Sequence, residues 1–188
     1  MSVEAQDFSG GIWLMWDSSI QIHLFQITNQ FIHGKSRFKI DSLWHFFTTV
    51  YASLNVTIRR NLWNMISNLN PSNNEPWIIG GDFNCILKME DRHRGSANNE
   101  GFSGNFNKFV FYNGLMDINS LGRHYTWSRG NLWQRLDRCL TNVRLNNLYP
   151  HSTIHHLERV GSDHYSLLLQ LNNDLHIERD REFRFLTA

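Results

Sequence analysis

A short apolar run that ends on two glycines is the feature that most constrains how this chain can fold. Residues 77–84 read WIIGGDFN, and their bulky, partly β-branched start favours a buried strand. The two glycines carry no side chain, so another backbone or a ligand can approach closely. If the chain stays extended through Phe83, Asp82 and Asn84 share one side at the strand end. The alternative is an Asx-turn, in which these two polar residues only cap a loop.

Composition predicts one folded, monomeric domain. The chain has 188 residues, 41% hydrophobic and 13% aromatic, which supports a real core and excludes disorder. A net charge of +1 means that any polyanion must be held by a local basic patch. Two distant cysteines, no signal-peptide pattern and no long apolar run predict an intracellular protein of the nucleus or cytoplasm without a membrane span.

The remaining extended segments are predicted from apolar and β-branched runs. Residues 11–16 and 20–28 flank DSS and indicate a hairpin or a bulged strand pair, and residues 33–39, HGKSRFK, read as a basic turn. Residues 43–53 read as extended. Four later segments also look like strands, with a hairpin turn at residues 129–131: HYTWSR, LWQRLDRCLT, STIHHLE and HYSLLLQL.

Two stretches with helical spacing predict amphipathic helices. Asn55 is a candidate N-cap for the first, and Ser103 for the second. We expect a single domain over residues 1–171 and a peripheral tail over residues 172–188. The predicted apolar stripes are Ile58, Leu62, Met65, Ile66 and Leu69 in the first helix, and Phe102, Phe106, Phe109 and Val110 in the second.

Two more stretches place polar groups where a purely structural strand would not. Asp137 lies among apolar residues in QRLDRCL, and a carboxylate in such a place needs a partner. Asp163 and His164 directly precede the leucine run of VGSDHYSLLL. Taken singly, Asp163 also fits a turn and His164 a structural histidine. The recurrence of an acid at three separate strands favours a shared site.

The segments GGDFN, YTWSRG followed by QRLDR, and GSDHYSLLL, in that order, resemble the endonuclease/exonuclease/phosphatase superfamily. Within it they are most similar to the apurinic-type endonuclease domain that precedes reverse transcriptase in LINE-type retrotransposons, particularly those of plants. The resemblance runs from about Gly10 to about Leu171. It implies a two-sheet α/β sandwich and a metal-dependent phosphodiesterase that nicks DNA.

The resemblance also implies roles for individual residues. Asp82 and Asn84 match the G-D-x-N motif, which positions the attacking water and contacts the scissile phosphate. Asp163 and His164 match the S-D-H motif, in which the acid is a metal-side ligand and the imidazole contacts the phosphate. Asp137 matches the acid that orients this histidine. Two aromatic residues match as well, namely Tyr51, near the phosphate or alternatively a core-edge tyrosine, and Trp127, mainly a packing residue.

The metal and the partner follow from the same resemblance. Asp82 and Asp163 are the expected metal ligands, with Mg²⁺ as the cofactor and Mn²⁺ as the alternative. DNA is the expected partner. Arg92, His93 and Arg94 follow the G-D-x-N loop and either contact a nucleic-acid backbone or form a solvated charged loop.

One departure from the family pattern weakens the functional expectation. Full members begin with strands that carry an asparagine and a metal-binding glutamate, and Glu4 lies too close to FSGG to take that place. We therefore expect a domain that lacks its first strands, with impaired activity. Two alternatives stay open: a non-catalytic retroelement remnant that binds nucleic acid, and a phosphatase for a small or lipid phosphate.

Overall fold

The computed structural model describes residues 2–3, 11–71, 75–94 and 104–172. Its centre is a six-stranded sheet in the order β3-β4-β5-β6-β12-β8. Strands β5 and β6 are parallel, and all other neighbours in this sheet are antiparallel. The strands span β3 (Ile20–Ile27), β4 (Phe31–Phe38), β5 (His45–Tyr51), β6 (Trp77–Asp82), β12 (Asp137–Asn142) and β8 (Leu115–Asp117).

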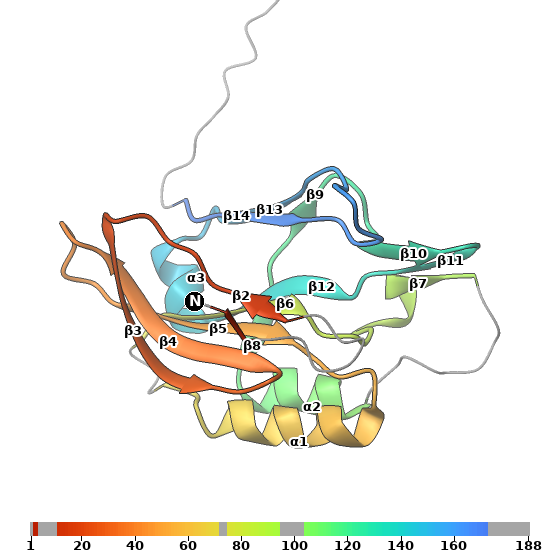
Figure 1. Cartoon of the computed structure of the whole chain (residues 1–188), viewed down its shortest axis with the longest axis horizontal. Coiled ribbons are helices and arrows are strands. Elements are labelled where there is room, and N and C mark those ends of the chain that lie inside the picture. The colour runs from red at the N-terminus through yellow and green to blue at the C-terminus, as the bar shows by residue number, and fades with distance from the viewer. Residues whose placement is uncertain (1, 4–10, 72–74, 95–103, 173–188) are drawn as a thin grey trace, which may run out of the picture.

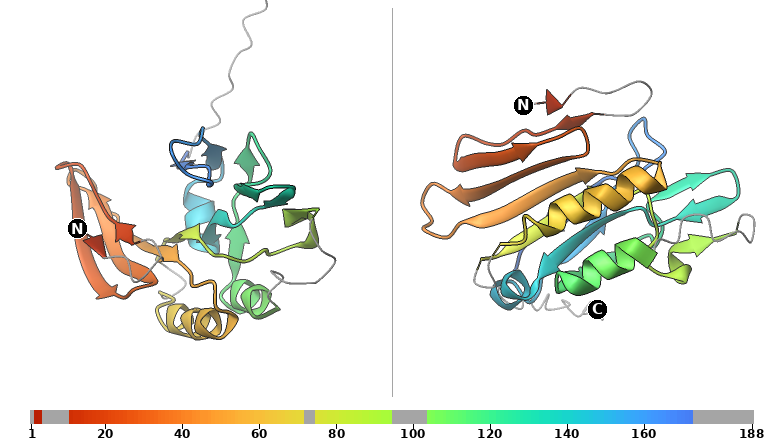
Figure 2. Two further views of the ribbon diagram at one scale, coloured as in Figure 1. Left: turned by 45° about the vertical axis from the view of Figure 1, so that its right-hand side comes forward. Right: turned by 90° about the horizontal axis from the view of Figure 1, so that it is seen from below.

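Three smaller sheets complete the β-structure. Strands β14 (Leu167–Gln170), β13 (Thr153–His156) and β9 (Ser120–Leu121) lie over one face of the large sheet, and the helices α1 and α2 cover the other face (Figures 1 and 2). The other two sheets are β10 (Trp127–Arg129), β11 (Leu132–Gln134) and β7 (Arg92–His93), and the pair β1 (Ser2–Val3) and β2 (Ile12–Trp13). This arrangement confirms the predicted two-sheet α/β sandwich.

Helix α1 (Val56–Ser67) forms the crossover between the parallel strands β5 and β6. Asn55 caps it as predicted, because its side-chain oxygen accepts the N–H groups of Thr57 and Ile58 at 2.9 and 3.2 Å. The buried apolar stripe is Leu62, Trp63 and Ile66. The predicted stripe was wrong at two positions, since Ile58 and Met65 are exposed.

The other helices are shorter. Helix α2 (Gly104–Tyr112) packs Phe106 and Phe109 against Trp63 of α1, with ring centroids 5.0 and 5.3 Å apart. The predicted positions Phe102 and Ser103 lie outside the described residues. Helix α3 (Val143–Leu148) continues directly from β12, and a single 3-10 turn covers Met89–Asp91. None of the helices among the described ranges has the length and apolar character needed to cross a bilayer.

The paired glycines of β6 permit close approach of a neighbouring backbone. Gly81 has φ +137°, and a Cβ atom there would stand 2.0 Å from the carbonyl oxygen of Val50 in β5. Phe83 then turns into the helix-side core, where its side chain is fully buried. The local prediction for residues 77–84 is therefore confirmed up to the end of the strand.

Two predictions near the amino terminus were wrong. Strand β2 pairs with β1 and not with β3, whose partner is β4. The segment 33–39 lies mostly in β4 and is not a turn. Gly34 is required there by close packing, because a Cβ atom would stand 2.5 Å from the carbonyl oxygen of His23. The real turn precedes β4, where the Thr28 hydroxyl accepts the N–H groups of Gln30 and Phe31.

Candidate active site

Tyr51, Asp82 and Asp137 form a row across three adjacent strands. Tyr51 of β5 is the register partner of Asp82 in β6, and Asp82 is the register partner of Asp137 in β12. Directly opposed residues share one face of a sheet, and this face looks toward β14. The carboxyl ends of two parallel strands therefore meet the amino end of an antiparallel strand at this point.

His164 completes a compact polar cluster. Its Nδ1 lies 2.8 Å from Oδ2 of Asp137. One ligand atom each from Asp82, Asp137 and His164 lie within 4.8 Å of one another. The predicted shared site is confirmed for these three side chains but not for Asp163, which lies outside the cluster, and the catalytic roles of all four residues stay a prediction.

Asp82 and Asn84 satisfy both interpretations of the WIIGGDFN segment. Asp82 accepts the backbone N–H of Asn84 at 2.8 Å, which is an Asx-turn, and also accepts the Asn84 amide at 2.9 Å. The same amide donates to the carbonyl oxygen of Ala52 at 2.8 Å. Asn84 has φ +48°, a left-handed conformation that asparagine tolerates well. The turn thus holds the amide beside the carboxylate.

Burial gives Asp82 unusual acid–base properties. Burial is the main cause that raises its pKa from 3.8 to about 7, and the nearby Asp137 carboxylate raises it further. The Asn84 N–H and the neighbouring His164 and Arg59 act in the opposite direction. A carboxyl group with such a pKa exchanges protons near neutral pH, as a general base must.

His164 is shifted toward its charged form. Burial alone would lower its pKa, but the hydrogen bond and the charge of Asp137 outweigh that effect, so the pKa lies above 6.5. The carboxylates of Asp82 and Asp163 contribute in the same direction. The predicted pairing of Asp137 with His164 is confirmed.

Asp163 is held differently from the other acids. Its Oδ2 accepts the indole N–H of Trp127 at 2.7 Å, and this bond is the main cause that lowers its pKa. Asp163 is exposed and is not part of the three-residue cluster. Trp127 was interpreted mainly as a packing residue, whereas the structure gives it a polar contact with a predicted metal ligand.

Thr126 ties the two halves of the cluster together. Its buried hydroxyl accepts the backbone N–H groups of Leu136 and Asp137 at 2.9 and 3.0 Å. Its carbonyl oxygen accepts the N–H of Tyr165 at 2.8 Å. Thr126 therefore holds the backbone both at Asp137 and at Tyr165, the residue after His164. The sequence contains no signal for this role beyond the position of Thr126 in the YTW segment.

Arg92 and His93 form β7, an edge strand of the sheet β10-β11-β7, and Arg94 follows it. Arg92 and His93 pair with Gln134 and Trp133 of β11, and Arg94 has φ +61°. His93 and Arg94 are exposed. Two of the three residues thus lie on an edge strand, and contact with a nucleic-acid backbone stays a prediction.

A buried ion network anchors that edge strand to β12. Arg138 is fully buried and donates to Asp91 and Asp117 at 3.0 and 2.9 Å. Asp91 also accepts the N–H groups of Leu87 and Lys88, so it closes the loop after β6. Since Arg138 follows Asp137 directly, the loop and the candidate site share one rigid support. Sequence reasoning missed this network.

The chain was compared with known proteins. A profile of the endonuclease/exonuclease/phosphatase family matches residues 6–164. No curated protein sequence matches the chain. The structure is similar to the endonuclease domain of TRAS1, a telomere-specific non-LTR retrotransposon, with TM-score 0.63 and 14% identity over 84% of this chain and 69% of that one.

Two further solved structures share the fold at the same low identity. An AP endonuclease from Archaeoglobus fulgidus has TM-score 0.55 and 14% identity, over 81% of this chain and 70% of that one. A β toxin from Staphylococcus aureus has TM-score 0.52 and 14% identity, over 76% of this chain and 57% of that one. The chain therefore spans between 57% and 70% of the length of these proteins.

Proposed function

Because the chain belongs to the endonuclease/exonuclease/phosphatase family, whose members hydrolyse phosphate esters, we propose that it is a DNA-nicking endonuclease of the retroelement type. The observation that carries the proposal is the convergence of Asp82, Asp137 and His164 at one strand end. The order of the three motifs supports the retroelement assignment, as does the fold shared with the TRAS1 domain.

The donor set fits a divalent cation. One ligand atom each from two carboxylates and an imidazole lie within 4.8 Å of one another, and the charge of Asp137 adds to burial in raising the pKa of Asp82, so a cation placed there would relieve that repulsion. We assign Mg²⁺, with Mn²⁺ as the alternative, held by Asp82 and by Asp163 near the cluster. When bound, the ion neutralises charge on the phosphate.

The side chains of the cluster and its neighbours have separate roles in the proposed reaction. The ionised carboxylate of Asp82 would accept a hydrogen bond from the attacking water and position it. Asn84 is held beside this carboxylate and orients the water. His164 is kept protonated by Asp137 and donates to a nonbridging phosphate oxygen, where negative charge develops. Tyr51 borders the same position.

Arg92, His93 and Arg94 are proposed to contact the DNA backbone beside the scissile phosphate. Arg92 and His93 lie on β7, in the same sheet as Trp127, the bridge partner of His164, and cationic groups there neutralise backbone charge. We expect slow turnover. Among the described residues, the clustered ligand atoms come from two carboxylates and one imidazole. Mg²⁺ binds weakly where a protein supplies few oxygen ligands.

Nicking of supercoiled plasmid tests the proposal. We expect Mg²⁺-dependent nicking that EDTA abolishes and that is lost in Asp82→Asn and His164→Ala, with exposed Arg60→Ala on helix α1 as the control. A preparation that binds DNA without cleaving it would support the non-catalytic alternative. Release of phosphate from small phosphate esters, without plasmid nicking, would identify a phosphatase.

A further inference from the structure

Helix α1 carries two consecutive arginines that lie in opposite environments. Arg60 is exposed, whereas Arg59 is buried and only 5% exposed. Among the described residues, Arg59 takes part in no ion pair with a carboxylate, and its Nε is buried without a hydrogen-bond partner. Burial of a charge in this way costs free energy, and an apolar side chain of similar size would fill the space at a lower cost. Stability alone therefore does not account for an arginine at this position.

The guanidinium of Arg59 binds the chain segment 52–54, which joins β5 to α1. Its Nη1 donates to the carbonyl oxygens of Ser53 and Leu54, each at 2.7 Å. The side-chain oxygen of Gln30, which is buried, accepts the N–H of Ser53 at 2.8 Å. Two buried polar side chains from different elements therefore hold this short segment.

The segment 52–54 in turn supports the candidate active site. It begins directly after Tyr51, and the N–H of Ala52 donates to the carbonyl oxygen of Asp82 at 2.8 Å. The carbonyl oxygen of Ala52 accepts the side-chain amide of Asn84 at 2.8 Å, and the same amide donates to Oδ2 of Asp82 at 2.9 Å. A shift of this segment would therefore move the acceptor that keeps the Asn84 amide beside the carboxylate.

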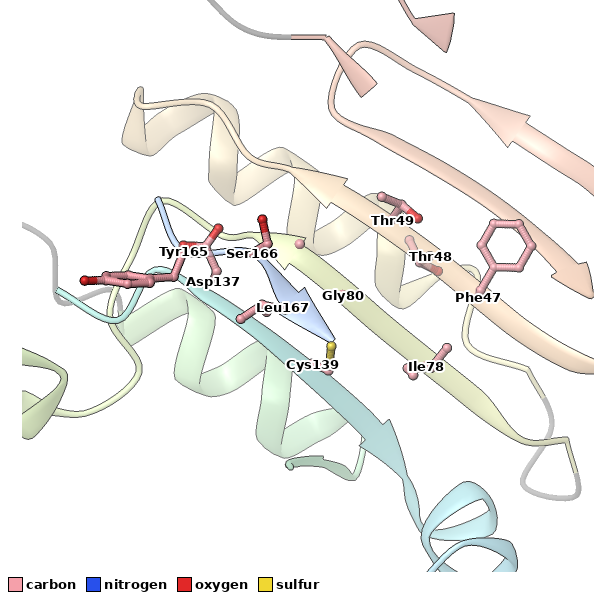
Figure 3. A pocket seen from close by; sticks show the side chains of 11 residues that line it. Phe47, Thr48, Thr49, Ile78, Gly80, Asp137, Cys139, Tyr165, Ser166 and Leu167 are labelled. Carbon is pink, nitrogen blue, oxygen red and sulfur yellow. The ribbon is translucent and has the colours of Figure 1, made fainter. Parts of the chain in front are cut away.

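Arg59 approaches the site from the helix side of the large sheet. The cavity lined by Asp137 and Tyr165 opens on one face of this sheet, and α1 lies behind the other face (Figure 3). Burial has the largest effect on the pKa of Asp82 and raises it, and Arg59 is among the groups that lower it, so the two charges lie near each other. Because its side chain is buried behind the sheet, Arg59 acts on the site through the segment 52–54 and not by touching a substrate.

We propose that Arg59 is a positioning residue of the candidate active site. Its two bonds fix the carbonyl groups of Ser53 and Leu54, and through them the Ala52 carbonyl group that holds the Asn84 amide. Asn84 orients the attacking water in the proposed reaction, and a small displacement of such a group costs about a hundredfold in rate. The expected effect on rate rests on the proposed endonuclease function, whereas the expected effect on Asn84 does not.

Substitutions of the two neighbouring arginines test the proposal. Arg59→Met removes both bonds and should lower the rate of plasmid nicking at saturating enzyme about a hundredfold, while the DNA affinity changes less than about twofold. Arg59→Lys should recover most of this rate, because a single nitrogen makes both bonds and an ammonium group carries three donors. Arg60→Met is the matched control and should nick like the unchanged chain. Circular dichroism verifies that each variant folds.

A double-mutant cycle separates positioning from a general loss of structure. If Arg59 acts through Asn84, Arg59→Met should lower the nicking rate less than about threefold in a chain that already carries Asn84→Ala. Full additivity of the two substitutions would overturn the proposal. A normal nicking rate of Arg59→Met, or an equal loss in Arg60→Met, would overturn it as well.

Solvent exchange of the Asn84 side-chain amide protons gives a readout without metal, DNA or cleavage. The NMR resonances of this amide are identified by their absence from Asn84→Ala. Their exchange should be at least about tenfold faster in Arg59→Met and unchanged in Arg59→Lys and Arg60→Met. Arg59→Gln, which keeps a polar group on a shorter and uncharged side chain, replaces Arg59→Met in both experiments if that variant does not fold.

The two readouts distinguish this proposal from the endonuclease function. Unchanged exchange of the Asn84 amide in the variant that lacks the guanidinium would overturn the role of Arg59, even in a chain that nicks DNA. Faster exchange in a chain that nicks no DNA would support the role of Arg59 and contradict the endonuclease function.

Discussion

Nδ1 of His164 and Oδ2 of Asp137 lie 2.8 Å apart, although the two residues are 27 positions apart in the chain. The bond joins the amino end of β12 to the segment before β14. It favours the imidazolium form, so the pKa of His164 lies above its usual 6.5.

The first prediction concerns this pair. In Asp137→Asn the pKa of His164 should fall below its value in the unchanged chain, because burial then dominates. An NMR titration of the imidazole measures both values. A His164 pKa at or below about 6.5 in the unchanged chain would contradict the pairing.

The same pair predicts a pH dependence of stability. A raised folded-state pKa stabilises the fold below the unfolded pKa, and this stabilisation is lost as the pH rises through the folded pKa. Asp137→Asn should therefore cost more free energy of unfolding at about pH 6 than at about pH 9. Urea denaturation at the two pH values measures the difference, and an equal cost would refute the linkage.

The second prediction separates stability from activity at Asp82. Its raised pKa means that the buried carboxylate opposes folding once it is ionised. With EDTA present, Asp82→Asn should raise the free energy of unfolding by roughly 1–2 kcal/mol at about pH 8 and leave it unchanged at about pH 3. This gain in the free energy of unfolding stays below the full cost of burying the Asp82 charge, because the substitution also weakens the contact with the Asn84 amide.

With Mg²⁺ in place of EDTA, the unchanged chain should become more stable than Asp82→Asn. Mg²⁺ stabilises the unchanged chain by binding to the folded state and leaves Asp82→Asn nearly unaffected. Thermal denaturation with and without Mg²⁺ measures both effects, and plasmid nicking should be absent in the variant. Equal Mg²⁺ stabilisation of the two proteins would show that Asp82 holds no metal.

The third prediction concerns Thr126. Thr126→Val leaves the N–H groups of Leu136 and Asp137 without their acceptor and should destabilise the fold by about 2 kcal/mol. Thr126→Ser keeps the hydroxyl and should cost less than about 1 kcal/mol. Chemical denaturation compares the two, and the nicking rate should fall only in the valine variant. Similar costs for both variants would mean that the methyl group, which serine lacks, contributes as much to stability as the hydroxyl, which valine lacks.

The fourth prediction uses two glycines with left-handed φ values. At Gly81 an added Cβ would meet the Val50 carbonyl oxygen at 2.0 Å, whereas at Gly130 nothing lies within 4 Å. Gly81→Ala should destabilise by about 3 kcal/mol or more, and Gly130→Ala by only about 1 kcal/mol. Thermal unfolding measures both. A mild effect at Gly81 would show that β5 and β6 can separate at low cost.

The sequence predicted correctly those elements that local residue preferences determine. The strand before Asp82, the Asn55 cap and the hairpin turn at Gly130 each depend on local residue preferences, and all three are present. The convergence of Asp82, Asp137 and His164 was reached through a family resemblance, because their distant positions give no local signal.

It failed where tertiary contacts decide. Gly34 looks like a turn residue, yet its lack of a side chain serves the close approach of β3. Ile58 and Met65 have helical spacing, but Trp63 occupies the inward position and leaves them exposed. Strands of two or three residues, such as β7 and β9, carry too little pattern to be recognised.

The parallel pair β5–β6 and the antiparallel strand β12 also determine when the polar cluster can exist during synthesis. Contacts between residues far apart in sequence form slowly, because loop closure must precede them. Asp82 is translated long before Asp137, and His164 comes last. A ribosome-bound chain that ends before His164 can hold the helix α1 and the strand β6 while its acids still lack their imidazole. The polar cluster is therefore incomplete in the nascent chain until His164 has emerged.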